Sequence, residues 1–382
     1  MRVLFSTTPL DGHFRPLLPL ARALRARGHE LAFATAASWH PVVEAEGFDA
    51  LAVGADHAAA RHVRLDSEWD AIQALPALDR RQHVFSYLFA QGHAPLKLAP
   101  LLDAARVWRA QAVVYESGDL AAPVVAASLR LASVNHGFGT MMPLSILERA
   151  APDVAPLWRS VGLEPAPYAG AFEGLYVDVV PAVLAEDRPL CPSIRLRLAN
   201  GEPVDPPSWL EQLPRPLVYA TMGTVFNRPA AFAPLVDGLA SAGVGALLTV
   251  GRNVDPSELG DVPPAIRVEK FVPQGQVLAS CAAVVSHGGS GTLLGTLAAG
   301  LPLVLLPQGA DQFENAARCE RAGAAVVLPP AEVTAEAVAA AVRLVLSQPA
   351  YAEAARVIAA EFAAMGTAEE AAGALEEYVD GR

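Results

Sequence analysis

One short segment combines glycines, hydroxyl side chains and a histidine where an apolar run gives way to a helical pattern. It reads Ser286-His-Gly-Gly-Ser-Gly-Thr292. Glycines let a ligand approach the backbone closely, and the first amides of a helix are donors without intrahelical partners. Such a segment suits a diphosphate, with the His287 ring and the Ser290 and Thr292 hydroxyls as further donors. A tight strand-to-helix turn capped by a threonine would leave the same pattern.

A dinucleotide is the competing ligand for this segment. Gly289, Gly291 and Gly295 approximate the spacing of a dinucleotide-binding loop, and Asp311 follows near the distance expected for a ribose contact. This interpretation would make the protein a nicotinamide-dependent oxidoreductase. Dinucleotide loops usually follow the first strand of their domain, whereas several strand candidates precede this loop in the same half of the chain. The order of the elements therefore disfavours it.

The N-terminal half carries a different candidate. His13 follows the first predicted strand, within Gly12-His-Phe-Arg-Pro16. A histidine titrates near pH ~6.5 and can take a proton from an attacking hydroxyl at neutral pH. The alternative is a loop histidine whose ring is satisfied by backbone groups.

Both halves repeat the order strand, loop, helix, strand, with nearly continuous apolar strands, which predicts parallel sheets covered by helices. In the first half we expect strands at 2–6, 31–35, 112–115 and 132–134, with helices at 16–27 and 120–129. In the second half we expect strands at 217–221, 245–250, 266–269, 282–286 and 303–306, with helices at 232–242 and 291–299. The predicted fold class is α/β, with two Rossmann-like doubly wound domains facing a cleft.

The other stretches fit this plan less regularly. Residues 56–108 are rich in charged and aromatic side chains, and 138–175 look irregular. The many prolines within 181–216 oppose regular structure and indicate a linker. We expect an N-terminal domain over 1–200, a second domain over 215–365, and a C-terminal helix over 366–382 that packs back on the N-terminal domain.

Composition excludes several classes of protein. Of the 382 residues, 53% are hydrophobic and only 18% are charged, which rules out a disordered chain. The net charge of −12 and the lack of a dense basic patch argue against a nucleic-acid partner. No apolar run reaches the roughly 20 residues of a membrane span, and we expect no secretory signal peptide. The three cysteines lack the paired spacing of a zinc site or disulfide framework, so we expect a cytoplasmic protein.

Several ordered motifs carry a family resemblance. Phe271-Val-Pro-Gln274, then His287–Thr292, then Pro307-Gln-Gly-Ala-Asp-Gln-Phe-Glu-Asn315 follow one another at close spacing. This arrangement resembles the donor-binding region of inverting glycosyltransferases of the UDP-glycosyltransferase superfamily, of the bacterial natural-product type, which have the GT-B fold. The similarity also includes Ser6–Pro16 with Gly28-His29, Thr221–Thr224 and Gly251–Pro256. It covers most of the chain outside 56–108 and 138–175.

The resemblance implies a donor site in the second half. The nucleotide base would pack against the region of Phe271, Val272 and Gln274. Asp311 and Gln312 would hydrogen-bond the donor sugar, although Asp311 could instead cap the helix that begins near Gln312. The diphosphate would contact Thr224, His287, Ser290, Gly291 and Thr292, and the expected donor site also includes Arg252 and Gly289.

Position 295 bears on the nucleotide. Plant members of the family carry a glutamate eight residues after the motif histidine, where it binds both ribose hydroxyls, and this chain has Gly295 there. A 2′-deoxyribose loses less from that absence. We therefore expect a dTDP-activated sugar, with UDP as the alternative.

The resemblance identifies His13 as the general base that deprotonates the acceptor hydroxyl. Relatives orient this histidine with an aspartate after a later strand, and the matching position here is Glu116, with Asp119 as the alternative. His136, after another predicted strand, could contact acceptor or donor. The sequence contains no Asp-x-Asp motif, so we expect no metal and no cofactor, with helix amides and His287 stabilising the leaving group.

Aromatic and methionine side chains in 56–108 and 138–175, the two stretches that the resemblance does not cover, would suit a flat, apolar acceptor. Core packing is the alternative for each of them. They are Trp69, Phe85, Tyr87, Phe89, Phe138, Met141 and Met142. The expected activity is inverting, metal-independent transfer of a sugar from a dTDP- or UDP-sugar donor to a hydroxyl of a hydrophobic natural product. The enzyme would be a monomer or homodimer that binds neither nucleic acid nor membrane. The rivals are the oxidoreductase, a non-catalytic nucleotide-sugar sensor and an epimerase on the same fold.

Overall fold

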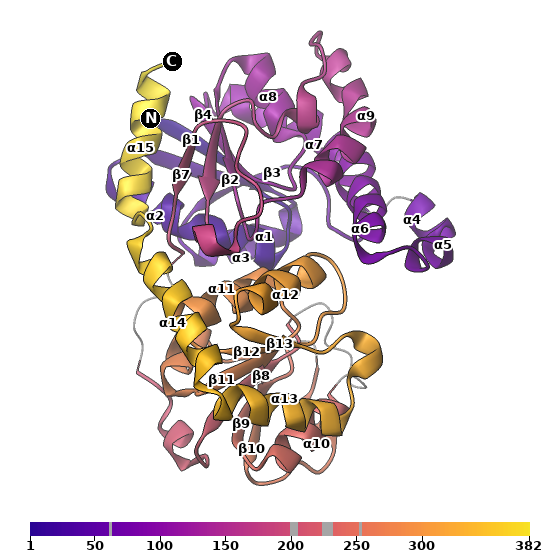
Figure 1. Ribbon diagram of the computed structural model, residues 1–382. Helices are drawn as coiled ribbons and strands as arrows, with labels where there is room; N and C mark the ends of the chain where they lie inside the picture. The colour runs from indigo at the N-terminus through magenta and orange to yellow at the C-terminus, as the bar shows by residue number, and fades with distance from the viewer. Residues whose placement is uncertain (61–62, 199–204, 224–231, 252–253) are drawn as a thin grey trace. The chain divides into compact units, whose positions relative to one another are not determined.

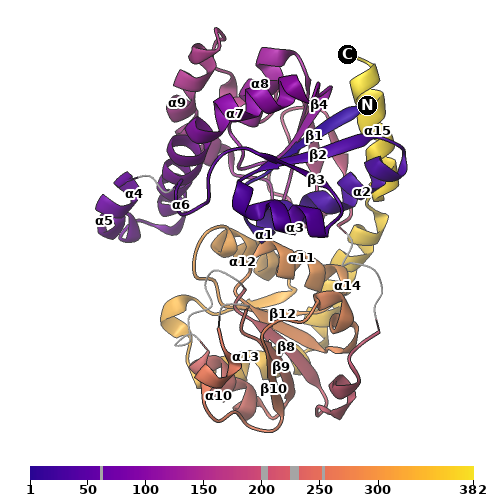
Figure 2. The same ribbon diagram turned by 180° about the vertical axis from the view of Figure 1, so that it is seen from behind.

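The structure, a computed structural model, describes residues 1–60, 63–198, 205–223, 232–251 and 254–382. Its contacts divide the chain into two compact units, drawn from opposite sides in Figure 1 and Figure 2. Unit 1 comprises Met1–Val180, Ala185–Leu198 and Met365–Arg382. Unit 2 comprises Pro181–Leu184 and Ala199–Ala364.

Unit 1 is built on a seven-stranded sheet of parallel strand pairs in the order β3-β2-β1-β4-β5-β6-β7. The strands are β1 (Arg2–Ser6), β2 (Glu30–Thr35), β3 (Asp49–Ala52), β4 (Ala112–Glu116), β5 (Ala132–His136), β6 (Leu175–Asp178) and β7 (Ser193–Arg195). Every residue of β4 and β5 is buried, as expected for central strands covered on both faces.

Helix α7 packs on α8 and on α9, and all three contribute to the main core of unit 1, where Leu101, Val125 and Trp158 are among the buried side chains. The helices of unit 1 are α1 (Asp11–Phe14), α2 (Leu18–Ala26), α3 (His40–Ala45), α4 (Val63–Ser67), α5 (Trp69–Gln73), α6 (Ala77–Phe85), α7 (Ala94–Val107), α8 (Ala122–Leu129), α9 (Leu144–Ser160) and α15 (Ala368–Asp380). A π-helical segment, Ser86–His93, joins α6 to α7. The insertion 56–108 is therefore largely helical.

The expectation of irregular structure over 138–175 is wrong, because α9 occupies much of this stretch. Pro152 and Pro156 lie inside α9, and residues of this type normally disfavour a helix interior. Both prolines are exposed, whereas Val154 and Trp158 on the opposite face are buried in the core. Burial of this apolar face outweighs the local preference. The proline-rich stretch 181–216 likewise contains a strand, β7, which pairs with β6 at the edge of the sheet.

The C-terminal helix α15 belongs to unit 1 and lies beside α2 (Figure 1). It begins with a capping box, in which the Thr367 hydroxyl accepts from the Glu370 amide at 3.2 Å and the Thr367 amide donates to the Glu370 carboxylate at 2.7 Å. Further along, the Glu376 carboxylate lies 2.6 Å from His29 Nε2, just before β2. These contacts attach the end of the chain to its beginning.

Unit 2 has a second parallel sheet, in the order β10-β9-β8-β11-β12-β13. Its strands are β8 (Leu217–Thr221), β9 (Gly245–Thr249), β10 (Ile266–Glu269), β11 (Ala283–Ser286), β12 (Leu303–Leu305) and β13 (Ala325–Val327). Its helices are α10 (Ala233–Ala242), α11 (Ser290–Ala298), α12 (Gln312–Arg321), α13 (Ala335–Ser347) and α14 (Pro349–Ala364). The apolar faces of α10 and α13 pack on β8, β9 and β11 to form the core of this unit.

Each sheet reverses its strand order at one point, between β1 and β4 in unit 1 and between β8 and β11 in unit 2. In doubly wound folds ligands bind at the carboxyl ends of the strands at this switch point. The loops that follow these strands begin at Thr7, Ser117, Met222 and His287. The α/β prediction of two doubly wound domains is confirmed, and its topology points to these four loops.

None of the helices among the described residues has the combined length and apolar character needed to cross a membrane.

Candidate active site

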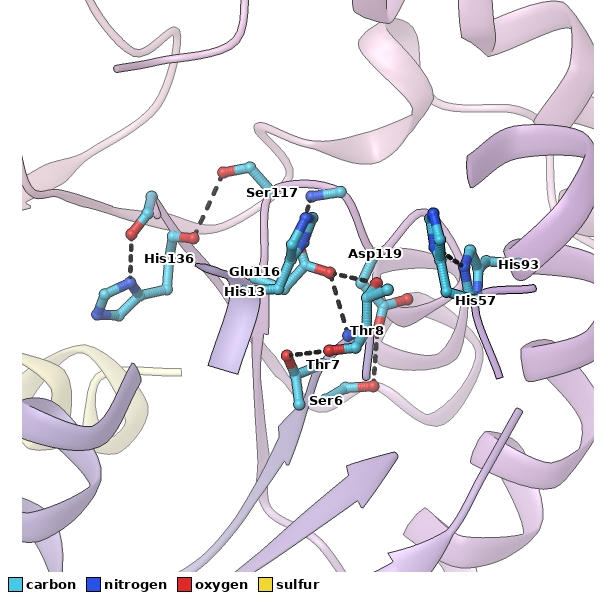
Figure 3. A network of polar contacts seen from close by, with 12 residues as sticks. Ser6, Thr7, Thr8, His13, His57, His93, Glu116, Ser117, Asp119 and His136 are labelled. Carbon is cyan, nitrogen blue, oxygen red and sulfur yellow. Dashed lines mark hydrogen bonds and ion pairs between the residues drawn. The ribbon is translucent and has the colours of Figure 1, made fainter. Parts of the chain in front are cut away.

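His13 and Glu116 lie beside each other at the switch point of unit 1 (Figure 3). His13 belongs to α1, which follows β1 directly, and Glu116 is the last residue of β4. His13 Nδ1 is 3.0 Å from Glu116 Oε2, the separation of an ion pair. Nδ1 is not aligned for a hydrogen bond with any group in the described part of the chain. The contact in this conformation is therefore electrostatic.

The Glu116 carboxylate is fully buried and held by other donors as well. Its Oε1 accepts from the Thr8 hydroxyl at 2.7 Å and from the Thr8 amide at 3.3 Å, and its Oε2 accepts from the Gly118 amide at 2.6 Å. Burial raises the pKa of Glu116, but His13, the Thr8 hydroxyl and Lys97 outweigh burial and hold this pKa at about 2. Glu116 is therefore ionised at neutral pH.

Two aromatic rings flank the imidazole of His13. The Phe138 ring centroid is 4.4 Å from that of His13, and the Phe89 centroid is 5.6 Å away in a stacked arrangement. The His13 side chain keeps an exposed fraction of 13%, and among the described residues no hydrogen bond uses its Nε2. One ring nitrogen thus faces a carboxylate in an apolar setting, while the other is free to meet a ligand.

Asp119, the alternative partner of His13, is engaged elsewhere. Its Oδ2 lies 2.6 Å from Lys97 Nζ and accepts from the Ser6 hydroxyl at 2.6 Å. Its Oδ1 accepts from the Ala121 and Ala122 amides at the start of α8, at 3.2 Å each. Asp119 therefore caps a helix and balances a buried ammonium, and Glu116 is the carboxylate that faces His13.

A second pair of histidines, His57 and His93, is shown in Figure 3. His57 Nδ1 is 3.0 Å from His93 Nε2, so one ring donates a hydrogen bond to the other. Both rings contact Phe89, with centroid separations of 6.4 and 5.8 Å. Burial and the neighbouring His57 lower the pKa of His93 to about 4. The two imidazoles therefore place polar nitrogen atoms close to the Phe89 ring.

His136 ends β5, next to β4 in the sheet. Its Nδ1 lies 2.6 Å from the Gly137 carbonyl, and its Nε2 has no partner among the described residues. Burial lowers the pKa of His136 to about 4, so the ring is neutral. The ring is fully enclosed in this conformation. Its contact with acceptor or donor stays a prediction.

In unit 2 the glycine-bearing segment connects β11 to α11 as expected. Gly289 occupies the N-cap position of α11 and provides no side-chain cap, so the amides of the first turn keep their donors available. Gly288 has φ of +84°, which only glycine adopts without strain. Thr292 is not the cap; its hydroxyl accepts from the Gln274 side-chain amide at 2.8 Å. The geometry is that of an open helix N-terminus rather than of a capped turn.

Asp311 lies at the N-cap position of α12 but makes no side-chain cap bond there. Its Oδ2 accepts instead from the Ser290 hydroxyl at 2.7 Å and from the Asn315 side-chain amide at 2.9 Å. Gln312 is buried, and its carbonyl oxygen accepts from the Gln308 and Gly309 amides at 2.8 and 3.1 Å. The structure thus joins Asp311 to the glycine segment, while the Gln312 carbonyl is committed to its own loop.

His287 packs between two glycines. A Cβ at Gly223 would lie 2.6 Å from the His287 ring, and one at Gly289 would lie 2.5 Å from its Nε2. Burial lowers the pKa of His287 to about 4, against the opposing effects of Asp311 and the Thr221 carbonyl. A neutral imidazole therefore lies at the opening of α11, beside the switch point between β8 and β11.

Other residues of the predicted donor set are placed unevenly. Phe271 is 51% exposed, and Val272 is buried. A Cβ at Gly291 would meet nothing within 4 Å, so this position is open. Thr224 and Arg252 lie outside the described residues. Among the residues described, no group of three or more His, Cys, Asp or Glu side chains could hold a metal ion.

Both halves of the chain match models of one protein family. The family model described as "Erythromycin biosynthesis protein CIII-like, N-terminal domain" matches residues 22–215, and its C-terminal counterpart matches residues 237–378. The chain belongs to the erythromycin biosynthesis protein CIII-like family of glycosyltransferases. It is 33% identical over 380 residues to the elloramycin glycosyltransferase ElmGT of Streptomyces olivaceus, covering 94% of this chain and 93% of that one. It is 31% identical to the L-demethylnoviosyl transferase of Streptomyces niveus, covering 86% and 85%.

Similarity to a solved structure identifies the fold of this CIII-like glycosyltransferase. The spinosyn rhamnosyltransferase SpnG superposes with a TM-score of 0.81 at 27% sequence identity, covering 98% of this chain and 100% of that one. The two parallel-sheet domains are therefore those of the GT-B fold. The resemblance inferred from the motifs is confirmed, and the protein is an enzyme that transfers a sugar to a natural-product acceptor. The oxidoreductase, sensor and epimerase alternatives are thereby set aside.

The structure also brings forward residues of this glycosyltransferase that the motifs did not single out. Thr8 and Gly118 hold Glu116, Lys97 neutralises Asp119, and Asn315 supports Asp311. The Thr8 and Lys97 contacts join segments far apart in the sequence, whereas Gly118 and Asn315 lie within four residues of the carboxylates they contact. The two loops that follow β1 and β4 could have pointed to Thr8 and Gly118, since parallel neighbours bring their carboxyl ends together.

Proposed function

We propose that this glycosyltransferase transfers a sugar from a dTDP-sugar, or from a UDP-sugar, to a hydroxyl of a hydrophobic natural product, with inversion at the anomeric carbon and without a metal ion. Unit 1 binds and activates the acceptor, and unit 2 binds the donor. The observation that carries this proposal is the contact between His13 and the buried, ionised Glu116 at the switch point of unit 1.

In this mechanism His13 Nε2 takes the proton of the acceptor hydroxyl as its oxygen attacks the anomeric carbon. The imidazolium that forms carries its second proton on Nδ1, toward Glu116 Oε2, so the carboxylate stabilises the developing positive charge. Attack from the face opposite the leaving nucleoside diphosphate gives inversion. The bond to the anomeric carbon forms as the bond to the diphosphate oxygen breaks.

The donor side rests on the opening of α11. The uncapped amides after Gly289, together with the helix dipole, suit the charge that develops on the leaving diphosphate. His287 is neutral there and supplies an N–H donor rather than a charge. Asp311, held by Ser290 at 2.7 Å, presents a carboxylate suited to sugar hydroxyls. These groups stabilise a leaving group without requiring a cation.

The preference for dTDP follows from Gly295, which lies within α11 and has no side chain to bind ribose hydroxyls. In support, SpnG has been solved in complex with thymidine diphosphate. The acceptor class follows from Phe89 and Phe138, which flank His13 and favour an apolar, flat molecule. SpnG has also been solved with spinosyn aglycone.

A donor and acceptor matrix tests the proposal. The purified enzyme is incubated with dTDP- and UDP-sugars and a set of polycyclic and macrocyclic aglycones, and products are detected by mass spectrometry. We expect glycosides from dTDP-sugars, activity that survives EDTA, and an anomeric configuration opposite to that of the donor by NMR. Retention of configuration, or activity lost with EDTA and restored by a divalent cation, contradicts the corresponding part of the proposal.

A further inference from the structure

We propose that Thr8 is a positioning residue that acts on His13 through Glu116. This inference rests on the proposed role of His13 as the base. It assigns a function to a side chain that has no contact with the reacting atoms and that the sequence motifs leave without a role.

The sheet register brings Thr8 to Glu116. In the parallel pair of β1 and β4, Ser6 lies opposite Tyr115, so the residues that follow these two leave the sheet side by side. Thr8 then donates twice to one oxygen of the carboxylate, through its hydroxyl at 2.7 Å and its amide at 3.3 Å. Thr8 is buried, with an exposed fraction of 2%, so water does not compete for this contact.

The two carboxylate oxygens of Glu116 have different partners. Oε1 is held by Thr8, whereas Oε2 faces His13 Nδ1 at 3.0 Å and accepts from the Gly118 amide at 2.6 Å. A carboxylate held at one oxygen alone can rotate about its terminal bond. The Thr8 hydroxyl opposes this rotation and so keeps Oε2 directed at His13. The negative charge of Oε2 beside Nδ1 favours the imidazole tautomer with its proton on Nδ1, which leaves Nε2 free to accept from the substrate.

Gly118 packs closely against the Glu116 carboxylate and leaves no space for a side chain. A Cβ at Gly118 would lie 2.9 Å from Glu116 Oε2 and 3.3 Å from two carbons of the Phe89 ring. Glycine therefore allows both the short amide contact and the packing of Phe89. An aspartate at position 116 would be shorter by one methylene, about 1.5 Å, and would not reach His13 and Thr8 together. The length of Glu116 therefore fits the positions of its two donors, Thr8 and Gly118.

The test compares three variants in the intact enzyme. Thr8→Val removes the hydroxyl at nearly constant volume, and Thr8→Ser retains it. Thr7→Val is the matched control, because Thr7 is equally buried and its hydroxyl donates only to the Thr8 carbonyl, at 3.1 Å. We expect Thr8→Val to lower kcat about 10- to 100-fold, as for other losses of catalytic alignment, with the KM for the donor within about twofold of the parent value. Thr8→Ser and Thr7→Val should stay close to the parent kcat.

A spectroscopic readout separates positioning from a general structural defect. The ¹⁵N chemical shifts of the His13 ring should report the Nδ1–H tautomer in the parent protein and in Thr8→Ser, and a mixture of tautomers in Thr8→Val. If Thr8→Val does not fold, Thr8→Ala takes its place, with the same expected loss of kcat and the same tautomer mixture.

Equal kcat values and equal ring shifts for Thr8→Val, or for Thr8→Ala in its place, and for Thr7→Val overturn the inference. His13→Ala distinguishes this failure from that of the proposed function. An inactive His13→Ala beside a fully active Thr8→Val removes the positioning role alone, whereas an active His13→Ala removes the base itself.

Discussion

Asp119 Oδ2 lies 2.6 Å from Lys97 Nζ, and this pairing leaves Glu116 as the carboxylate that faces His13. Two acidic side chains lie within one turn of chain at the end of β4, and both are buried. Asp119 is balanced by the ammonium of Lys97, while Glu116 lies beside His13, where in the proposed mechanism it balances the positive charge of the imidazolium. The carboxyl end of β4 thus holds one structural ion pair and one contact that we propose to be catalytic.

The Lys97 pair predicts a large effect on stability. Lys97 is 5% exposed and Asp119 is 4% exposed, so Lys97→Met leaves the Asp119 carboxylate buried without its ion-pair partner. We expect the free energy of unfolding in urea to fall by about 3–5 kcal/mol. The double variant Lys97→Met with Asp119→Asn should lose less than the sum of the two single variants.

The chain offers a matched control for this prediction. Its other lysine, Lys270, lies 3.3 Å from Asp255, and both side chains are more than half exposed. Lys270→Met should leave the unfolding midpoint nearly unchanged because water screens the exposed pair. Equal effects of the two lysine variants contradict the interpretation of Lys97.

Glu116 predicts a dependence of stability on acid. Burial opposes its ionisation, but His13 and the other donors lower its pKa from the ordinary value of 4.5 to about 2. A carboxylate with a lowered pKa stabilises the fold above its ordinary pKa, and this contribution is lost as the pH falls from about 4.5 toward 2. Glu116→Gln should lack this part of the acid dependence. The comparison is made by urea unfolding at several pH values, and parallel curves for the two proteins speak against an ionised Glu116.

His287 predicts how nucleotide binding depends on pH. Burial holds its pKa at about 4, so the ring is neutral from pH 5 to 8 and contributes a hydrogen bond rather than a charge. His287→Ala should weaken dTDP binding by about tenfold, the effect of one lost hydrogen bond to a charged group, measured by calorimetry. The loss should be the same at pH 6 and pH 8. A loss that grows steeply as the pH is lowered within this range points to a protonated ring.

Asn315 predicts an effect on the donor through Asp311. Asn315 is 1% exposed, and its side-chain amide donates to Asp311 Oδ2 at 2.9 Å and to the Gly288 carbonyl at 3.0 Å. It therefore links the carboxylate that we propose to bind the sugar to the glycine segment. Asn315→Leu should raise the KM for the sugar nucleotide several-fold and leave acceptor binding unchanged. Steady-state kinetics with each substrate varied in turn measures both values. A change in acceptor KM alone is the contrary result.

Much of the fold could be predicted because its signals are local. Strands such as β4 and β8 are continuous apolar runs, and the glycines at 288 and 289 mark the turn from β11 into α11. The helix α9 escaped prediction because its two prolines are locally unfavourable, and only the packing of its buried face in the core shows why it forms. Local propensity is a weak guide where tertiary contacts decide.

The site divides in the same way. His13, Glu116 and Asp311 belong to sequence motifs, so the residues themselves could be picked out in advance. The partners that hold them could not. Thr8 meets Glu116, and Lys97 meets Asp119, across neighbouring strands and an inserted helix, and these contacts depend on the register of the sheet. The choice between Glu116 and Asp119 likewise required the geometry, because both follow the same strand.

The central claim, that His13 is the general base, is tested most directly by comparing turnover and nucleotide binding in His13→Ala. Single-turnover rates are measured with a dTDP-sugar and an accepted aglycone, and dTDP affinity is measured by calorimetry on the same preparation. We predict a rate lowered by about 10²- to 10⁴-fold, the usual contribution of a general base, with dTDP affinity unchanged. A rate within a few-fold of the parent enzyme would contradict the account.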